Sequence, residues 1–202
     1  MKYSVLIAVS LFLLGCAAPM PSAQSKFYRL QSPAVTEVSF DLANTLTVVV
    51  GPIDFAEYLK RSSLVVQVSE TEYDVLKLDQ WGGSLESEFQ LALGKNLIHN
   101  LPHIQFVRYP SRGVNVDFTL RAEILGFDGK LGQQARLEAN WWIEGAKGRP
   151  LKSGRYAQSR PVSASTLDAL VQAESVLISD FSRSLSEALQ QYLPGSSQSD
   201  TK

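Results

Sequence analysis

Hydrophobic and polar residues alternate along three neighbouring stretches of the chain. Every second side chain is apolar in residues 116–124 and again in 135–143, and a similar stretch covers 151–159. Such alternation is typical of half-buried strands. Short turns at 128–130 and 145–150 would reverse the chain between them. The pattern therefore predicts an antiparallel meander of three strands.

An almost continuously apolar run lies nearer the N-terminus. Residues 45–50 (TLTVVV) are rich in β-branched side chains and end at Gly51-Pro52. This predicts a central strand that is buried on both faces. Val38 and Phe40 would extend a strand in the mixed stretch before it. Other short strands are predicted at 27–30, 64–68, 73–78 and 104–109, with a turn or short helical piece at 55–61.

A first amphipathic helix is predicted over residues 85–101, where apolar residues recur at three- and four-residue spacing. The turn at 81–84 precedes it and Pro102 stops it. Glu86 and Glu88 fall in its first turn, where acidic residues complement the helix dipole. We expect both glutamates to be solvated.

A second amphipathic helix is predicted to begin at an N-cap, Ser165, with Asp168 three residues on, and to end at Pro194. Both helices need an apolar surface, and a sheet with one polar face offers only one. The predicted fold class is therefore α+β, a mainly antiparallel sheet with two amphipathic helices packed on one face.

The N-terminus has the order of a secretion signal. Lys2 is followed by the apolar run 5–14, and Gly15 stands directly before Cys16. The run is shorter than the ~20 residues that span a bilayer. Leu-Leu-Gly-Cys resembles the lipobox of bacterial lipoproteins, and the alternative is an ordinary signal peptide followed by a chance cysteine. The resemblance implies cleavage before Cys16, which would carry a diacylglyceryl thioether and an N-acyl chain such as palmitate. By the same resemblance Ala17, in place of aspartate, implies sorting to the outer membrane.

These features divide the chain into four segments. We expect a signal peptide at 1–15, a lipidated N-terminus and tether at 16–25, a single α+β domain at 26–194 and a disordered tail at 195–202. Charge is nearly balanced, with 19 Lys and Arg against 20 Asp and Glu, and no basic cluster is present. We therefore expect no binding to nucleic acid.

The sequence offers no catalytic constellation. His99 and His103 flank the end of the first predicted helix, and without a second cysteine or a carboxylate cluster they lack partners for a zinc site. Both are predicted to be polar surface residues. A Ser-His-Asp triad stays open, because its members converge only in space, but no G-x-S-x-G motif supports one. We expect a non-enzymatic protein with no metal and no cofactor.

Two adjacent tryptophans give the remaining signal. Trp141 and Trp142 lie on one predicted strand and point to opposite faces. Trp141 continues the apolar set and is predicted to lie in the core. Trp142 joins the polar set, which predicts exposure, and an exposed tryptophan can contact a partner or lipid. The alternative is that a helix, a loop or a neighbouring chain covers it.

Several short pieces stand in a fixed order along the chain: Leu13-Leu14-Gly15-Cys16, Phe27-Tyr28-Arg29-Leu30, Val48-Val49-Val50-Gly51-Pro52, Tyr58-Leu59-Lys60-Arg61, Trp81 with Leu85, and Asn96-Leu97. In order and spacing they resemble the ABC-type transport auxiliary lipoproteins over essentially the whole mature domain. Two pieces depart from the family pattern. Ser62 stands where a proline often follows the arginine, and residues 82–84 replace an alanine, an acidic residue and a proline.

The resemblance implies an outer-membrane lipoprotein on the periplasmic face that docks an envelope-spanning MCE-domain protein in lipid transport and supports membrane integrity. It implies a homo-oligomer around that partner. Tyr58, Arg61 and Trp81 are candidate partner contacts by resemblance, and Trp142 is one by alternation. The competing hypothesis is an outer-membrane lipoprotein that activates or scaffolds a periplasmic peptidoglycan enzyme, which the short tether disfavours. A histidine-dependent periplasmic hydrolase is a third class.

Overall fold

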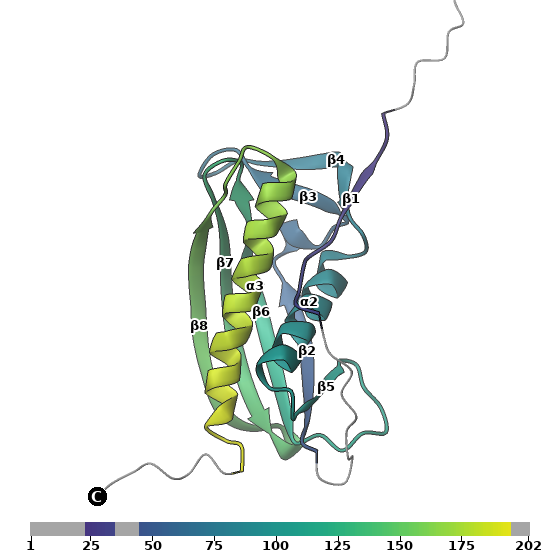
Figure 1. Cartoon of the computed structure of the whole chain (residues 1–202), viewed down its shortest axis with the longest axis vertical. Helices are drawn as coiled ribbons and strands as arrows, with labels where there is room; N and C mark the ends of the chain where they lie inside the picture. Colours follow the sequence, from purple (N-terminus) through teal and green to yellow (C-terminus); the bar gives the residue numbers. More distant parts are fainter. Residues whose placement is uncertain (1–22, 35–44, 195–202) are drawn as a thin grey trace, which may run out of the picture.

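The computed structural model describes residues 23–34 and 45–194 (Figure 1). The strands are β1 (Lys26–Tyr28), β2 (Thr47–Phe55), β3 (Ser63–Gln67), β4 (Tyr73–Trp81), β5 (Gln105–Arg108), β6 (Phe118–Lys130), β7 (Gln134–Gly145) and β8 (Arg149–Pro161). The helices are α2 (Leu85–Asn100) and α3 (Leu167–Gln190), with short 3₁₀ turns η1 (Glu57–Leu59) and η2 (Ala146–Gly148). Val38, Phe40, Cys16, Ala17 and the tail at 195–202 lie outside the described residues.

A five-stranded sheet with the order β5-β2-β6-β7-β8 forms the centre of the molecule. β6, β7 and β8 pair antiparallel over almost their whole lengths, which confirms the predicted meander. The predicted turn at 128–130 is wrong, because β6 continues to Lys130 and the chain reverses over residues 131–133. Gly132 takes the positive φ of 66° that this turn needs.

Strand β2 lies between β5 and β6 and pairs parallel with both. Its side chains Val48, Val49 and Val50 are at most 4 % exposed, so the predicted burial on both faces is confirmed. The predicted stop at Gly51-Pro52 is wrong. The register shifts between Val50 and Ile53, and the strand then continues to Phe55. A local irregularity absorbs the proline without ending the strand.

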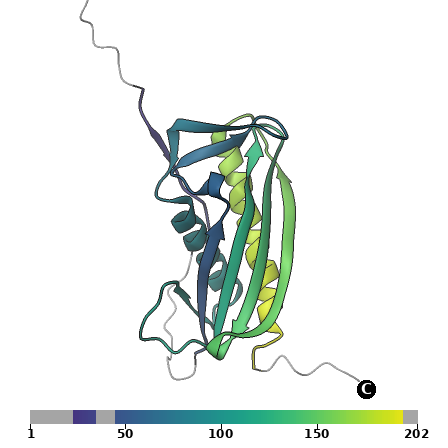
Figure 2. The same ribbon diagram turned by 180° about the vertical axis from the view of Figure 1, so that it is seen from behind.

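Both helices cover the same face of this sheet, as predicted (Figures 1 and 2). α3 lies across β6, β7 and β8, and α2 lies beside it on β2 and β5. Asn100 of α2 donates to Ser182 Oγ of α3 at 3.2 Å, which links the helices near one end. Side by side, the two helices remove the apolar face of the sheet from water.

The ends of the helices refine the prediction. α2 begins at the N-cap Ser84, whose side chain accepts a hydrogen bond from the Ser87 backbone N–H at 3.2 Å. α3 is capped by Thr166, one residue after the predicted Ser165, and Thr166 Oγ1 accepts from Ala169 N–H. Glu88 is not solvated as predicted, because it turns inward and is only 7 % exposed.

A second, three-stranded sheet with the order β1-β4-β3 closes one end of the molecule (Figure 1). β3 and β4 pair antiparallel, while β1 pairs parallel with β4. The α+β class is confirmed, and both sheets are mixed in direction rather than purely antiparallel. β1 and β2 pair parallel with their neighbours. Parallel strands are joined by longer crossover connections and not by hairpins.

A continuous hydrophobic core joins the helices to both sheets. Phe89 of α2 is fully buried, and its ring meets Phe55 and Phe127 edge-on, with centroids 5.4 and 5.3 Å away. Such aromatic contacts add to the stability from burial alone. Phe89 therefore packs α2 against β2 and β6 of the large sheet.

Gly129 of β6 is packed closely against β7 and against Leu170 of α3, which leads to a prediction. A Cβ at Gly129 would lie 2.6 Å from the Gln134 carbonyl oxygen and 2.7 Å from Leu170 Cδ1. The Gln134 backbone is held in the sheet and cannot move aside for the added methyl group. We therefore expect Gly129→Ala to lower the free energy of unfolding, measured by urea denaturation, by about 1–3 kcal/mol. Gly83→Ala is the control, since a Cβ there meets only Glu88 Oε1 at 3.9 Å. Equal stabilities of the two variants would contradict the prediction.

Candidate functional site

Among residues 23–34 and 45–194, no three His, Cys, Asp or Glu side chains lie close enough together to hold a metal ion. His99 is exposed in the last turn of α2, and His103 is exposed just beyond it. The histidines therefore lie on the surface, as predicted. Within the same residues no helix has the length and apolar character to cross a membrane.

Tyr58 belongs to a buried polar network. Its hydroxyl donates to Oδ2 of Asp128, which is fully buried on β6. Arg136 of β7 donates to Asp128 Oδ1 at 2.9 Å and to the Tyr73 hydroxyl at 2.7 Å. The rings of Tyr58 and Tyr73 lie 5.0 Å apart. The network joins η1 and β4 to the large sheet.

Burial and the Asp128 carboxylate together fix the charges of Tyr58 and Arg136. Burial and the hydrogen bond to Asp128 raise the pKa of Tyr58 well above its usual value. The hydrogen bond to Asp128 also raises the pKa of Arg136. The phenol is therefore a neutral donor and the guanidinium a cation at any physiological pH. These roles are structural, since no group is left to exchange a proton with a substrate.

Glu174 of α3 is a second buried acid and lacks such partners. It is 2 % exposed, and its Oε2 has no hydrogen-bond partner among the described residues. Together with Trp81 and Leu170 it lines a narrow hollow under the small sheet. Burial raises the pKa of Glu174 well above its usual value, and the nearby Asp128 adds to the shift. The carboxyl is therefore protonated over a wide pH range.

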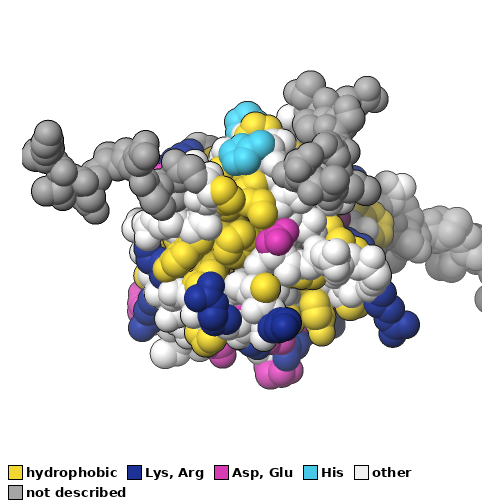
Figure 3. Space-filling view, turned by 90° about the horizontal axis from the view of Figure 1, so that it is seen from below, with side chains coloured by type: hydrophobic (Ala, Val, Ile, Leu, Met, Phe, Trp, Pro, Cys, Tyr) yellow, Lys and Arg dark blue, Asp and Glu magenta, His cyan; other side chains and the backbone are white. Residues whose placement is uncertain are grey.

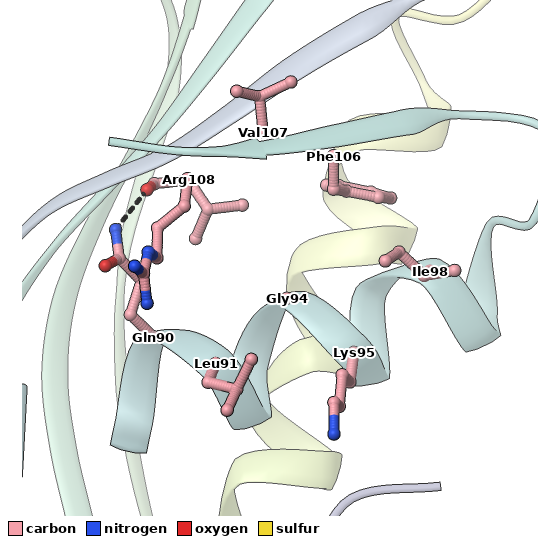
Figure 4. Close-up of a pocket in the computed structure, with 9 residues that line it drawn as sticks. Gln90, Leu91, Gly94, Lys95, Ile98, Phe106, Val107 and Arg108 are labelled. Atoms are coloured by element: carbon pink, nitrogen blue, oxygen red, sulfur yellow. Dashed lines mark hydrogen bonds between the residues drawn. The ribbon is translucent and has the colours of Figure 1, made fainter. Parts of the chain in front are cut away.

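A groove opens between α2 and the edge strand β5, which we call the α2–β5 groove (Figure 4). Its cavity volume is about 140 Å³. Its surface is mainly apolar, and its residues are Val50, Gln90, Leu91, Gly94, Lys95, Ile98, Phe106, Val107 and Arg108. Gln90 Nε2 donates to the Val50 carbonyl at 2.7 Å, and this hydrogen bond closes one end.

Gly94 lies in the wall of this groove. It lies in the middle of α2, where glycine costs about 1 kcal/mol relative to alanine. A Cβ at this position would meet no atom within 4 Å, so no close contact requires the missing side chain. The residue instead leaves space between Leu91 and Ile98, which Figure 4 shows on the same helix.

A further apolar surface lies at the end of the molecule away from the small sheet. Figure 3 shows hydrophobic side chains gathered in a band across this end, beside the two histidines. Leu46, Phe118 and Leu151 stand at the starts of β2, β6 and β8 and are partly buried against the core. These strands run in the same direction, so their first residues meet at one end of the sheet.

Comparison with known proteins identifies the family of this chain. The family model for the ABC-type transport auxiliary lipoprotein component matches residues 28–194. The chain belongs to this family. No curated protein matches the chain in sequence.

Two solved structures show the same fold as this chain. The crystal structure of an uncharacterized protein has 17 % identity and a TM-score of 0.69, covering 83 % of this chain and 99 % of that one. A Xanthomonas campestris protein has 15 % identity and a TM-score of 0.63, covering 80 % and 92 %. A PelC dodecamer from Paraburkholderia phytofirmans reaches only 0.44, with 12 % identity and 77 % and 94 % coverage.

The predicted contact residues of this auxiliary lipoprotein lie in different surroundings. Trp81 is 5 % exposed and lies in the core, whereas Tyr58 is half-buried in the polar network. Arg61 is exposed in the bend after η1. Trp142 is 39 % exposed on the sheet face opposite the helices, while Trp141 is buried, so the predicted exposure of one side chain and burial of the other are confirmed. The structure does not bring the four together, and partner contact at them stays a prediction.

Sequence reasoning missed Glu174, although a signal was present. Glu174 is four residues after Leu170 and four before Ile178, so it continues the buried stripe of α3. A charged residue on an apolar stripe is expected to be neutral or paired when the helix packs. The groove gave a weaker signal, a glycine inside a helical pattern.

The burial of Glu174 predicts a dependence of stability on pH. The folded protein keeps this proton when the unfolded chain has lost it, so raising the pH above the ordinary glutamate pKa lowers the free energy of unfolding. Glu174→Gln removes the titration. We expect the variant to gain stability over the wild type by up to about 1.4 kcal/mol per pH unit between pH 5 and 8.

Urea denaturation followed by circular dichroism at several pH values measures this difference. Glu187→Gln is the matched control, because Glu187 is exposed on the same helix. Its stability difference from the wild type is expected to stay constant with pH. A constant difference for Glu174→Gln as well would refute a neutral buried carboxyl.

Proposed function

We propose that this protein is the outer-membrane docking subunit of an envelope lipid-transport system. It holds the outer-membrane end of an MCE-domain protein that spans the periplasm, and so supports membrane integrity. The observation that carries this proposal is the match of residues 28–194 to a transport auxiliary lipoprotein component. In this role the protein positions a partner, and it needs neither a catalytic group nor a cofactor.

The anchor in this proposal is the lipid on Cys16. Two or three acyl chains hold a protein stably, because each buried methylene contributes about 0.8 kcal/mol. The ten residues from Cys16 to the start of β1 at Lys26 span at most about 35 Å when extended. The domain would therefore stay close to the periplasmic face of the outer membrane.

We place the partner contact on exposed side chains of the family domain. Trp142 is an aromatic side chain on the polar face of the sheet, and exposed tryptophan is enriched at binding hot spots. Arg61 offers an exposed cation near the small sheet. We further propose a homo-oligomer around the partner. Strand β8 supports this, because its 13 residues form an edge of the five-stranded sheet.

Affinity purification of the tagged, lipidated protein from gently solubilised envelopes tests the proposal. We expect a stoichiometric MCE-domain protein in the mass spectrum, and about tenfold less of it with Trp142→Ala if this side chain is a hot spot. Val176→Ala is the control, since Val176 is 47 % exposed on α3 at the other face. A peptidoglycan synthase captured in place of the MCE protein would refute the proposal in favour of an enzyme activator.

Sorting to the outer membrane gives a separate prediction. Ala17→Asp places an acidic residue after the lipidated cysteine, and we expect the protein to move to the inner-membrane fraction of a density gradient. Cys16→Ser is the control that removes the anchor, and it should leave an uncleaved or mislocalised chain. If Ala17→Asp fractionates like the wild type, Ala17 carries no sorting information.

A further inference from the structure

We propose that the α2–β5 groove binds one acyl chain of an anionic phospholipid, with the phosphate at Arg108. This inference rests on the proposed function, and it adds a lipid-binding site to a subunit otherwise described as a docking device. The groove lies at an edge of the large sheet, because β5 ends the strand order there. A ligand could therefore enter from the side without disturbing the sheet.

The shape and lining of the groove fit a hydrocarbon chain. Leu91 and Ile98 from α2 face Phe106 from β5, and Val50 forms part of the buried wall. Each of the first three is only partly buried, so a ligand would remove apolar surface that now contacts water. Gly94 leaves the middle of the helix side empty, since a Cβ there would meet nothing within 4 Å.

The charges at the groove favour an anionic head group. Arg108 and Lys95 line it, no carboxylate does, and neither cation forms an ion pair with another described residue. Figure 4 shows Arg108 extending from β5 toward Gln90 at the closed end, whereas the Lys95 ammonium group points away from β5. A guanidinium binds phosphate through two parallel hydrogen bonds, so Arg108 is the better phosphate ligand.

The polar groups at the groove are few. The Gln90 side chain is engaged through Nε2 with the carbonyls of Val50 and Tyr109, so the charge at the groove comes from Arg108 and Lys95. The groove has an apolar length and a cationic end, which matches a molecule with a chain and one charged end. Small-molecule sites commonly show this combination of apolar walls with few polar groups.

Photocrosslinking tests the site. The full-length lipidated protein in detergent is exposed to phosphatidylglycerol that carries a photoreactive group in one acyl chain, and cross-linked peptides are mapped by mass spectrometry. We expect cross-links in α2 and β5, and about tenfold fewer with Gly94→Leu, whose side chain fills the groove. Gly94→Ala is the matched control, because one methyl group leaves most of the space and improves the helix.

A second variant tests the head group. Arg108→Gln should reduce the preference for phosphatidylglycerol over phosphatidylcholine about fivefold. The phosphate of phosphatidylcholine is already paired with its own choline cation, whereas the phosphate of phosphatidylglycerol depends on a protein cation such as Arg108. Wild-type cross-links spread evenly over the surface, or equal cross-linking of Gly94→Leu and Gly94→Ala, would overturn the inference.

Capture of the MCE-domain protein by the same variants separates this inference from the proposed function. We expect Gly94→Leu to keep the partner while it loses the lipid. If the wild type captures the partner but forms no cross-links in the groove, the lipid site fails and the docking function stands. If Gly94→Leu loses the partner and the wild type has no groove cross-links, the groove is a protein contact and the lipid site is refuted.

Discussion

The buried carboxylate of Asp128 is the constraint on which the joining of the two sheets depends. It is fully enclosed on β6, where Arg136 and the Tyr58 hydroxyl satisfy it. Arg136 also donates a hydrogen bond to Tyr73 of β4. Through its hydrogen bonds to Tyr58 and Tyr73, the ion pair in the large sheet is therefore connected to η1 and to the small sheet. Removing a charge from water costs several kcal/mol, and the cost is offset only while every partner stays in place. The small sheet is therefore held in one orientation by electrostatics as well as by packing.

The two helices divide the work of covering the sheet unequally. α3 buries a long stripe against β6, β7 and β8, and it even takes Glu174 out of water. α2 packs Phe89 and four aliphatic side chains into the core. It turns a partly apolar side toward β5. A helix that only closed a core would have no use for an open space at Gly94. α2 is thus the element where core packing and the proposed lipid site meet.

Family and fold contribute different information about this protein. The solved structures share 15–17 % identity with it at TM-scores of 0.63 and 0.69, a likeness that concerns the backbone arrangement. Function depends on sites carried by a fold, and the same fold can carry several. The match to the auxiliary lipoprotein family over residues 28–194 therefore carries the functional argument. The structure adds two surfaces to this argument. We propose the exposed face with Trp142 as the partner contact and the α2–β5 groove as the lipid site.

The sequence determined the elements whose periodicity is strong. The meander, the buried β2, the two helices on one face and the opposite directions of Trp141 and Trp142 all followed from spacing, because alternation and helical repeats reflect burial directly. Tertiary contacts decided the rest. A parallel partner on each side of β2 comes from distant chain segments, and no local signal marks such pairing.

Side-chain surroundings also depended on the tertiary structure. Tyr58 and Trp81 were candidate partner contacts by resemblance, yet one is bound to Asp128, 70 residues away, and the other is covered by the core. The groove beside Gly94 depends on β5, which the tertiary structure places opposite α2. Local sequence sets which way a side chain points, and only the packing of remote segments decides what it meets there.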